Sequence, residues 1–213
     1  GVAGRSLRNQ DALAIGKAFG TVLIESHKKQ VFVARDGRLS SDSLHRFLTD
    51  GLASCGLTGI DIGVCPTPAL YFATQTGRTD CGVMVTASHN PKEYNGFKFV
   101  LNGKLFFGEK IQALGERIAA ADFASGKGER ETQDIKPLYI QKLLTAYQTG
   151  KQPLTVVWDC GNGTAATIVP ELVKLLNGQH ILLNAAVDGS FPAHAPAASN
   201  PAELTGLKNA VLE

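Results

Sequence analysis

Residues 83–100 constrain the fold of this chain more than any other stretch, because they have the pattern of two strands joined by a short polar loop. An apolar run is followed there by a hydroxyl, an imidazole and an amide, at Ser88, His89 and Asn90. Pro91 disfavours the helical region for the residue before it and has no N–H to donate, so we expect a turn-like loop rather than a helix start. Ser88 should then lie exposed at the end of a strand.

A tight hairpin is predicted directly after this loop. An Asn-Gly pair at residues 102–103 separates two β-prone runs, residues 97–101 and 104–107, and this dipeptide is a strong signal for a type I′ turn. In the first run the aromatic residues alternate with Lys98, which therefore faces the other side of the sheet. Because a hairpin introduces antiparallel strands, we expect the sheet to be mixed.

The rest of the first 150 residues alternates between predicted strands and helices. Strands are expected over residues 31–34 and 58–64, helices over 11–27, 69–76, 108–124 and 135–147, and an exposed loop over 125–132. A further helix, capped by Ser40 or Ser41, is expected to carry Leu44, Phe47, Leu48 and Leu52. This alternation predicts an α/β fold, with a mixed β-sheet between helices, for a first domain over residues 1–150.

A second, incomplete α/β domain of the same type is predicted over residues 151–213. Its elements are a strand at 154–159, a turn at Gly161-Asn162-Gly163, a helix at about 165–176, a strand at 181–183 and a helix that starts near Asn200. Two strands are too few for an independent layered domain. The chain lacks an initial methionine and closes inside a predicted helix, so we expect both ends to be cut.

Composition argues against several classes of function. The formal net charge is only +2 and no run of Lys or Arg occurs, so we expect no nucleic-acid binding. The four cysteines are far apart and form no C-x-x-C pair, which indicates neither a zinc site nor a redox motif. We expect each cysteine to be a small buried hydrophobe. Without a signal-like segment or an apolar run that fits a bilayer, we expect no membrane contact and a cytoplasmic location.

Residues 86–98 contain Thr-Ala-Ser-His-Asn-Pro and, after one lysine, Glu-Tyr-Asn-Gly-Phe-Lys. This ordered segment resembles the phosphoserine loop of the α-D-phosphohexomutases, and it is most similar to their bacterial phosphomannomutase/phosphoglucomutase branch. The Arg-Asp-Gly-Arg turn at residues 35–38 also resembles a turn that lies near the serine loop of these enzymes. The resemblance implies phosphohexomutase domain 1 followed by a part of domain 2 that ends before the metal-binding loop.

The resemblance also implies an isomerase reaction carried out by phosphoryl transfer. Such an enzyme interconverts hexose 6-phosphate and hexose 1-phosphate, of mannose or glucose, through a hexose 1,6-bisphosphate intermediate. Ser88 is then the expected phosphoryl carrier. His89 and Lys98 are expected to stabilise charge or handle protons, because phosphoryl transfer depends mostly on positioning and electrostatics.

The supporting residues and the metal are implied in the same way. Asn90, Arg35 and Asp36 are expected to support the loop or the phosphate. In the family Mg²⁺ joins the phosphoserine, here Ser88, to three aspartates of domain 2, and no D-x-D-x-D occurs in this chain. Because a hard cation needs several oxygen ligands, we expect this chain alone to be inactive. Its expected partners are sugar phosphates and the missing C-terminal domains.

Two other interpretations stay open. In the first, the chain is a catalytically silent binding or interaction protein of the same fold. In the second, the G-x-G-x-x-A pattern at residues 161–166 marks a dinucleotide-binding module, because it follows a strand and precedes a helix. Against the second, no acidic residue closes the next strand at the usual distance. The sequence does not distinguish mannose from glucose, since no sugar-reading loop lies within it.

Overall fold

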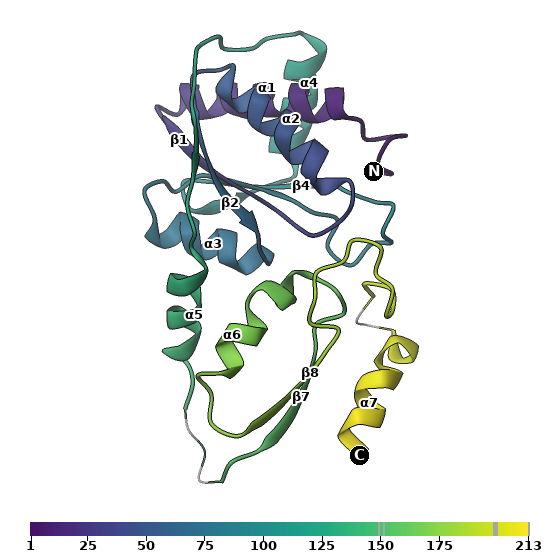
Figure 1. Cartoon of the computed structure of the whole chain (residues 1–213). Helices are drawn as coiled ribbons and strands as arrows, with labels where there is room; N and C mark the ends of the chain where they lie inside the picture. Colours follow the sequence, from purple (N-terminus) through teal and green to yellow (C-terminus); the bar gives the residue numbers. More distant parts are fainter. Residues whose placement is uncertain (149, 151, 198–199, 213) are drawn as a thin grey trace.

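A computed structural model describes residues 1–148, 150, 152–197 and 200–212. It has two units, which lie one above the other in Figure 1 and are joined by α5 (Lys136–Leu144). The upper unit, residues 1–132, contains a six-stranded sheet between helices. The lower unit, residues 152–197 and 200–212, contains a two-stranded sheet with short helices. The α/β class is therefore as predicted.

The sheet of the upper unit is mixed and has the strand order β5-β4-β3-β1-β2-β6. The strands are β1 (Gln30–Arg35), β2 (Thr58–Val64), β3 (Gly82–Val85), β4 (Phe97–Leu101), β5 (Lys104–Phe106) and β6 (Arg130–Thr132). Strands β1, β2, β3 and β6 pair in parallel, and β4 runs antiparallel to both β3 and β5. Asn102 and Gly103 have φ of 55° and 67°, the positive values that a type I′ turn needs, so the predicted hairpin is confirmed.

Helices cover both faces of this sheet (Figure 1). One face packs against α1 (Asn9–Glu25), α2 (Ser41–Ala53) and α4 (Glu109–Ala119), and the other packs against α3 (Thr67–Thr76) and α5. Phe19 of α1 and Phe99 of β4 meet in the first core, with ring centroids 4.7 Å apart. The four central residues of β1 are fully buried because a parallel strand is covered on both faces.

One strand was not predicted. The segment that we expected to be an exposed loop at 125–132 contains β6, whose residues Arg130 and Thr132 pair with Gly59 and Asp61 of β2. The expectation was wrong because β6 is a short, charged edge strand. Backbone hydrogen bonds to β2 hold it, and such a strand carries no hydrophobic alternation in its sequence.

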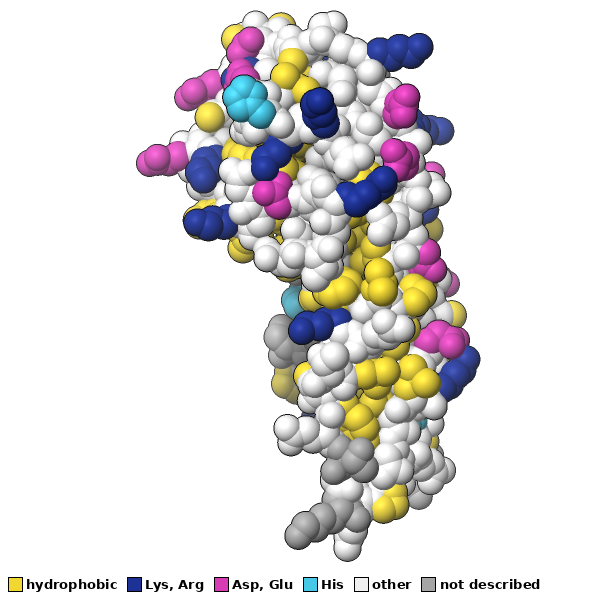
Figure 2. Space-filling view, turned by 90° about the vertical axis from the view of Figure 1, so that its left-hand side faces the viewer, with side chains coloured by type: hydrophobic (Ala, Val, Ile, Leu, Met, Phe, Trp, Pro, Cys, Tyr) yellow, Lys and Arg dark blue, Asp and Glu magenta, His cyan; other side chains and the backbone are white. Residues whose placement is uncertain are grey.

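The lower unit is less completely buried than the upper one. Its elements are β7 (Thr155–Asp159), β8 (Gln179–Leu183), the 3₁₀ turns Thr164–Thr167 and Pro201–Leu204, α6 (Val169–Val173) and α7 (Thr205–Leu212). The helix predicted over 165–176 is interrupted at Ile168, because Pro170 has no N–H to continue the ladder. No residue of β7 or β8 is fully buried. Figure 2 shows hydrophobic side chains exposed on one side of this unit. Exposed hydrophobic residues of the lower unit include Leu154 and Leu175.

No helix in the described ranges combines the length and the apolar character that crossing a membrane requires. The four cysteines are free and buried, as expected. Burial raises the pKa of the Cys65 thiol to about 12, so it stays protonated and unreactive at neutral pH.

The crossing of α1 and α2 depends on two facing glycines. A Cβ on Gly16 would lie 2.2 Å from the Leu48 carbonyl oxygen, and one on Gly51 would lie 2.3 Å from that of Leu13. Both contacts are with backbone, so the helices would have to move apart. We expect Gly51→Ala to lower the free energy of unfolding by about 1–3 kcal/mol, as overpacking does, measured by urea unfolding with circular dichroism.

Gly115 provides the matched control, because it lies in α4 with open space where its Cβ would be. Gly115→Ala is expected to raise the free energy of unfolding by about 0.5–1 kcal/mol, since glycine is a poor helix former. Equal effects of the two substitutions would contradict the close helix crossing.

Candidate active site

Two loops meet at the carboxyl edge of the parallel strands. Strands β1 and β3 are neighbours, with Arg35 opposite Val85, and the Asp36 N–H donates to the Val85 carbonyl at 2.9 Å. The segment that follows β1 therefore lies directly beside the segment that follows β3. This second segment, residues 86–96, is called the Ser88 loop below. Ligands of open α/β sheets bind at this edge.

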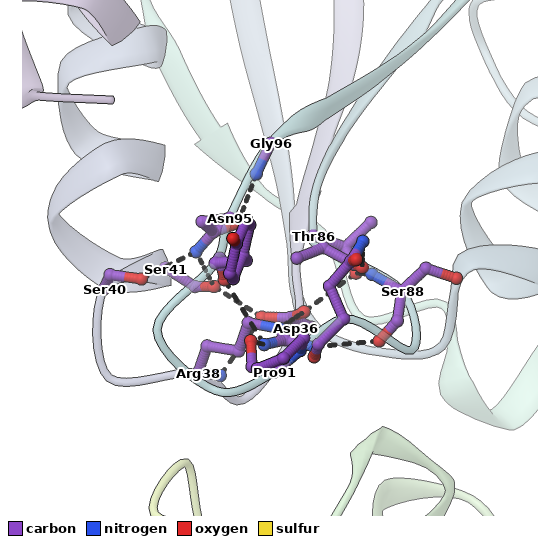
Figure 3. Close-up of polar contacts among 12 residues, drawn as sticks. Asp36, Arg38, Ser40, Ser41, Thr86, Ser88, Pro91, Asn95 and Gly96 are labelled. Carbon is purple, nitrogen blue, oxygen red and sulfur yellow. Dashed lines mark hydrogen bonds and ion pairs between the residues drawn. The ribbon is translucent and has the colours of Figure 1, made fainter. Parts of the chain in front are cut away.

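The Asp36 carboxylate is the centre of a buried hydrogen-bond network (Figure 3). One of its oxygens accepts from the Arg38 N–H at 3.1 Å and from the Ser41 hydroxyl. The other accepts from the Thr86 hydroxyl at 2.8 Å and from the Arg38 Nε at 3.1 Å. The turn after β1, the start of α2 and the Ser88 loop are thereby joined at a single carboxylate.

Arg38 binds the backbone of the Ser88 loop. Its Nη1 donates to the carbonyls of Pro91 at 2.6 Å and Tyr94 at 3.3 Å, and its Nη2 donates to those of Ser88 at 2.9 Å and Asn90 at 2.8 Å. With Nε on the carboxylate, all five guanidinium N–H groups are used. The side chain is 1% exposed. A loop whose carbonyls converge on a buried cation is fixed in one conformation.

Ser88 has a constrained backbone and an exposed side chain. Its φ of 57° lies in the left-handed region, which costs an L-residue about 1–2 kcal/mol. The Ser88 N–H donates to the Thr86 hydroxyl at 3.0 Å, and its carbonyl accepts from Arg38. Both backbone groups are thus occupied, and the hydroxyl points away from the network in Figure 3. Strain of this kind persists where the surrounding contacts enforce it, often at functional sites.

Asn95 anchors the far end of the Ser88 loop. Its side-chain amide donates to the hydroxyls of Ser40 and Ser41 at 2.9 Å each, and its side-chain carbonyl accepts from the Gly96 N–H at 2.9 Å. Asn95 is buried. The loop is therefore held at both ends by side chains near the start of α2.

The residues expected from the sequence divide into two groups. Ser88, Asn90 and Asp36 lie in the network, where the Asn90 side chain closes the turn by donating to the Ala87 carbonyl at 2.9 Å. Arg35 does not join them. It forms an ion pair with Asp42 at 3.0 Å. Neighbouring residues of a strand face opposite sides, which separates this arginine from the carboxylate that follows it.

His89 and Lys98 stay unpaired within the described chain. His89 is exposed in the Ser88 loop, and Lys98 lies in β4 opposite Met84. Neither side chain forms a hydrogen bond or an ion pair with another described residue. Both are therefore free of internal partners, which is compatible with a role toward a bound anion.

Sequence reasoning missed five residues of the network, namely Arg38, Ser40, Ser41, Thr86 and Asn95. Four are neutral hydroxyl or amide side chains, whose importance appears only when their partners are known. Arg38 belongs to the Arg-Asp-Gly-Arg motif. Its place just after the predicted end of a strand was the signal that could have indicated a role at the site.

A pocket of about 320 Å³ lies where the two units meet. His89, Lys92 and Glu93 line it from the Ser88 loop, and Phe191 and Pro196 are among the residues that line it from the lower unit. The exposed side of the Ser88 loop therefore faces the lower unit across a small cavity.

The glycine-rich turn of the lower unit is satisfied by the chain itself. The N–H groups of Gly161, Asn162 and Gly163 donate to Asp159 at 2.9 Å, to Asn184 at 3.1 Å and to the Cys160 carbonyl at 2.8 Å. A Cβ on Gly161 would lie 2.8 Å from the His194 ring. These amides are therefore not available for a pyrophosphate, which is what a dinucleotide site requires of them.

His194 and Asp159 form a pair beside this turn, with Nε2 3.1 Å from the carboxylate. Nδ1 of His194 lies 2.9 Å from the Ala195 carbonyl, so both ring nitrogens face acceptors and the imidazolium is favoured. The hydrogen bond to Ala195 and the Asp159 charge raise the pKa of His194 against the opposing effect of burial. Burial alone would raise the pKa of Asp159, but hydrogen bonds from Asn184 and Gly161, together with His194, lower it.

A pH dependence follows from this pair. Because the folded pKa of His194 exceeds the unfolded value of about 6.5, its contribution is complete below that pH and is lost as the pH rises through the folded pKa. We expect the lower unit to lose on the order of 1 kcal/mol of stability as the pH rises above about 6.5. Urea unfolding followed by the fluorescence of Trp158, the single tryptophan, measures it. His194→Gln should remove most of the pH dependence, and an unchanged dependence would contradict the pairing.

Comparison with known proteins identifies the family. The family model described as phosphoglucomutase/phosphomannomutase, alpha/beta/alpha domain I, matches residues 1–125, and the model for domain II matches residues 137–213. The chain belongs to the phosphoglucomutase/phosphomannomutase family, as the resemblance of the Ser88 loop predicted.

Within the family the chain is similar to bacterial members. It is 44% identical over 207 residues to the phosphomannomutase/phosphoglucomutase of Pseudomonas aeruginosa strain PAO1, which covers 97% of this chain and 44% of the relative. It is 36% identical over 209 residues to the phosphoglucomutase of Neisseria meningitidis serogroup B, with 97% and 45% coverage. A phosphoglucomutase/phosphomannomutase family protein from Burkholderia thailandensis has a similar crystal structure, with a TM-score of 0.93, 38% identity and coverage of 99% of this chain and 48% of that one. The chain thus spans less than half the length of these proteins.

The described residues do not form a metal site by themselves. No group of three or more His, Cys, Asp or Glu side chains in the described ranges is arranged to hold a metal ion. The Asp36 carboxylate already accepts four hydrogen bonds, so its oxygens are not free to bind a metal ion. Mg²⁺ is coordinated by about six oxygen ligands, several of them water. The described part of the chain does not place a group of carboxylates that could complete such a site.

Proposed function

We propose that the whole protein to which this chain belongs interconverts hexose 6-phosphate and hexose 1-phosphate, with Ser88 as the phosphoryl carrier. The observation that carries the proposal is the state of Ser88, whose backbone is fixed on both sides while its hydroxyl is exposed. A rigid loop that presents one hydroxyl suits a covalent carrier, since positioning supplies much of the rate of phosphoryl transfer. Membership of the phosphoglucomutase/phosphomannomutase family supports the same reaction.

The reaction is a pair of transfers that returns the enzyme to its starting state. The phosphoryl group leaves the Ser88 oxygen for a free hydroxyl of the sugar monophosphate, the proton of that hydroxyl ends on the Ser88 oxygen, and a hexose 1,6-bisphosphate forms. The bisphosphate then turns around, and its other phosphoryl group returns to Ser88. His89 and Lys98 are proposed to stabilise the charge on the moving group or to transfer this proton, because neither side chain is paired with another residue in the described part of the chain. Asn90 and Asp36 support the loop from the network, and Arg35 is proposed only as an outer support.

Mg²⁺ is the proposed cofactor of the whole protein, and the phosphate on Ser88 is its proposed contact in this chain. Hexose 1-phosphate, hexose 6-phosphate and the bisphosphate are the proposed ligands, of mannose, glucose or both. We also propose that residues 1–150 and 151–213 belong to successive domains, and that this chain by itself has no mutase activity. Each of these proposals can be tested by assays of this chain and of the full-length product of the gene.

Mass spectrometry tests the assignment of Ser88 directly. The full-length product is incubated with glucose 1,6-bisphosphate, and the peptide that contains residues 86–98 is sequenced. One phosphate on Ser88 is expected, and when it carries an isotopic label, the label should pass to the sugar after unlabelled glucose 1-phosphate is added. A phosphate at another serine, or none on an active enzyme, would refute the assignment.

A further inference from the structure

The turn that carries Arg38 is also the place where the lower unit touches the upper one. A Cβ on Gly189 would lie 2.4 Å from the Gly37 carbonyl oxygen and 2.6 Å from the Leu39 nitrogen. A Cβ on Gly37 would lie 2.3 Å from the Val187 side chain. Gly189 thus allows the segment of residues 187–191, called the Phe191 segment below, to contact the turn backbone to backbone, and Gly37 leaves room for the Val187 side chain.

Phe191 covers Arg38 from this side. The guanidinium carbon lies 5.5 Å from the centroid of the Phe191 ring, within the range of a cation–π contact. The ring is aimed by a strained backbone, because Phe191 has a φ of 51° and its N–H donates to the Asp188 carbonyl at 3.0 Å. The cation that holds the Ser88 loop is therefore held in turn by an aromatic ring of the other unit.

The Phe191 segment is fixed to the sheet of the lower unit. The Asp188 N–H donates to the Asn162 carbonyl at 3.0 Å, and the Asn162 side chain donates to the Ala186 carbonyl at 3.0 Å. Asn162 belongs to the turn that follows β7. A displacement of the lower unit is consequently a displacement of the ring that covers Arg38.

We propose that Arg38 is a positioning residue for Ser88, and that the Phe191 segment controls it by excluding water from its guanidinium. Without the ring, water competes for the N–H groups that bind the four loop carbonyls, and the loop loses its single conformation. The order of the Ser88 loop then depends on how closely the two units are docked. The catalytic meaning of this coupling rests on the proposed function, but the coupling itself does not.

Hydrogen exchange tests the coupling without any turnover. In Phe191→Ala, the amides of Ser88, Asn90 and Tyr94 are expected to exchange about three- to tenfold faster, the range that loss of one cation–π contact gives, while β1 amides stay unchanged. Phe191→Tyr, which keeps the ring, should restore the slow exchange. Phe191→Gln fills a similar space with a polar amide that admits water, and it provides a second variant with the same expected acceleration if alanine impairs folding. Unchanged loop exchange, or an equal acceleration in β1, would overturn the coupling.

Kinetics of the full-length product test the positioning role. Arg38→Lys replaces five fixed donors by three, so we expect kcat to fall about tenfold or more with KM for the hexose phosphate within about twofold. Leu114→Ala is the control that loses stability away from the loop, because Leu114 is buried in α4, which packs against α1, and it should leave both loop exchange and kcat unchanged. An equal fall of kcat in Leu114→Ala, or a change in KM alone, would overturn the role of Arg38. Failure of the proposed function would appear separately, as activity of a Ser88→Ala enzyme with the exchange result intact.

Discussion

Replacing Ser88 with alanine in the full-length product is expected to lower mutase turnover by roughly a thousandfold or more, which corresponds to about 4 kcal/mol of barrier. The hydroxyl is the proposed point of attachment of the phosphoryl group, and Ser88 carries the one exposed aliphatic hydroxyl of the Ser88 loop, since Thr86 is buried. A covalent carrier divides one difficult transfer into two easier ones, so its loss removes the route rather than slowing it. Turnover is measured with glucose 1-phosphate and a trace of the bisphosphate.

The loss should occur without a loss of fold. Ser88 donates no side-chain hydrogen bond to the network, and alanine keeps the same Cβ at a φ of 57°. The free energy of unfolding should therefore change by less than about 0.5 kcal/mol, as for other surface substitutions. Ser125→Ala, an exposed serine between α4 and β6, is the matched control and should keep full turnover. Substantial turnover by the Ser88→Ala enzyme would instead mean that the Ser88 loop does not carry the phosphoryl group.

Asp36→Asn is expected to give the largest loss of stability, about 3–5 kcal/mol, because it leaves the buried Arg38 without its ion-pair partner. Both oxygens of the carboxylate accept two hydrogen bonds. An asparagine therefore turns its NH₂ group toward two donors, whichever way the amide is placed. Urea unfolding of the full-length product, followed by circular dichroism, measures the change, and turnover should fall with it because the Ser88 loop loses its support.

Asp42→Asn is the matched control for this prediction. Asp42 also pairs with an arginine, Arg35 at 3.0 Å, but its side chain is 75% exposed. An exposed pair contributes little, so the expected loss is about 1 kcal/mol or less. If the two substitutions cost the same, the buried network does not have the importance that its geometry indicates.

Local patterns accounted for most of the elements. The Asn-Gly turn at 102–103, the strand at Thr58–Val64 and the loop before Pro91 follow from conformational rules that act over a few residues. Patterns failed where neighbours in space decided the outcome. The strand β6 exists because β2 offers it an edge, and its own charged residues do not indicate it.

The candidate site shows the same division. Ser88 was found from the loop that presents it, and Asp36 from its motif. The sequence did not show which of the two arginines of that motif supports the Ser88 loop. Arg35 is the last residue of β1 and pairs outward with Asp42, while Arg38 lies beyond the turn and reaches the loop. Which one supports Ser88 depends on the direction in which the turn leaves the sheet.

By itself, the sequence determined the α/β class, the family and the exposed serine at the end of β3, because each of these is written in a continuous stretch of chain. The tertiary structure alone decided what holds that serine in place. The contacts of Arg38 with the Ser88 loop join residues that are 50 or more positions apart, and the ring of Phe191 contacts Arg38 from the other unit. Such contacts form only when parallel strands bring distant loops to one edge of a sheet, so no local pattern encodes them.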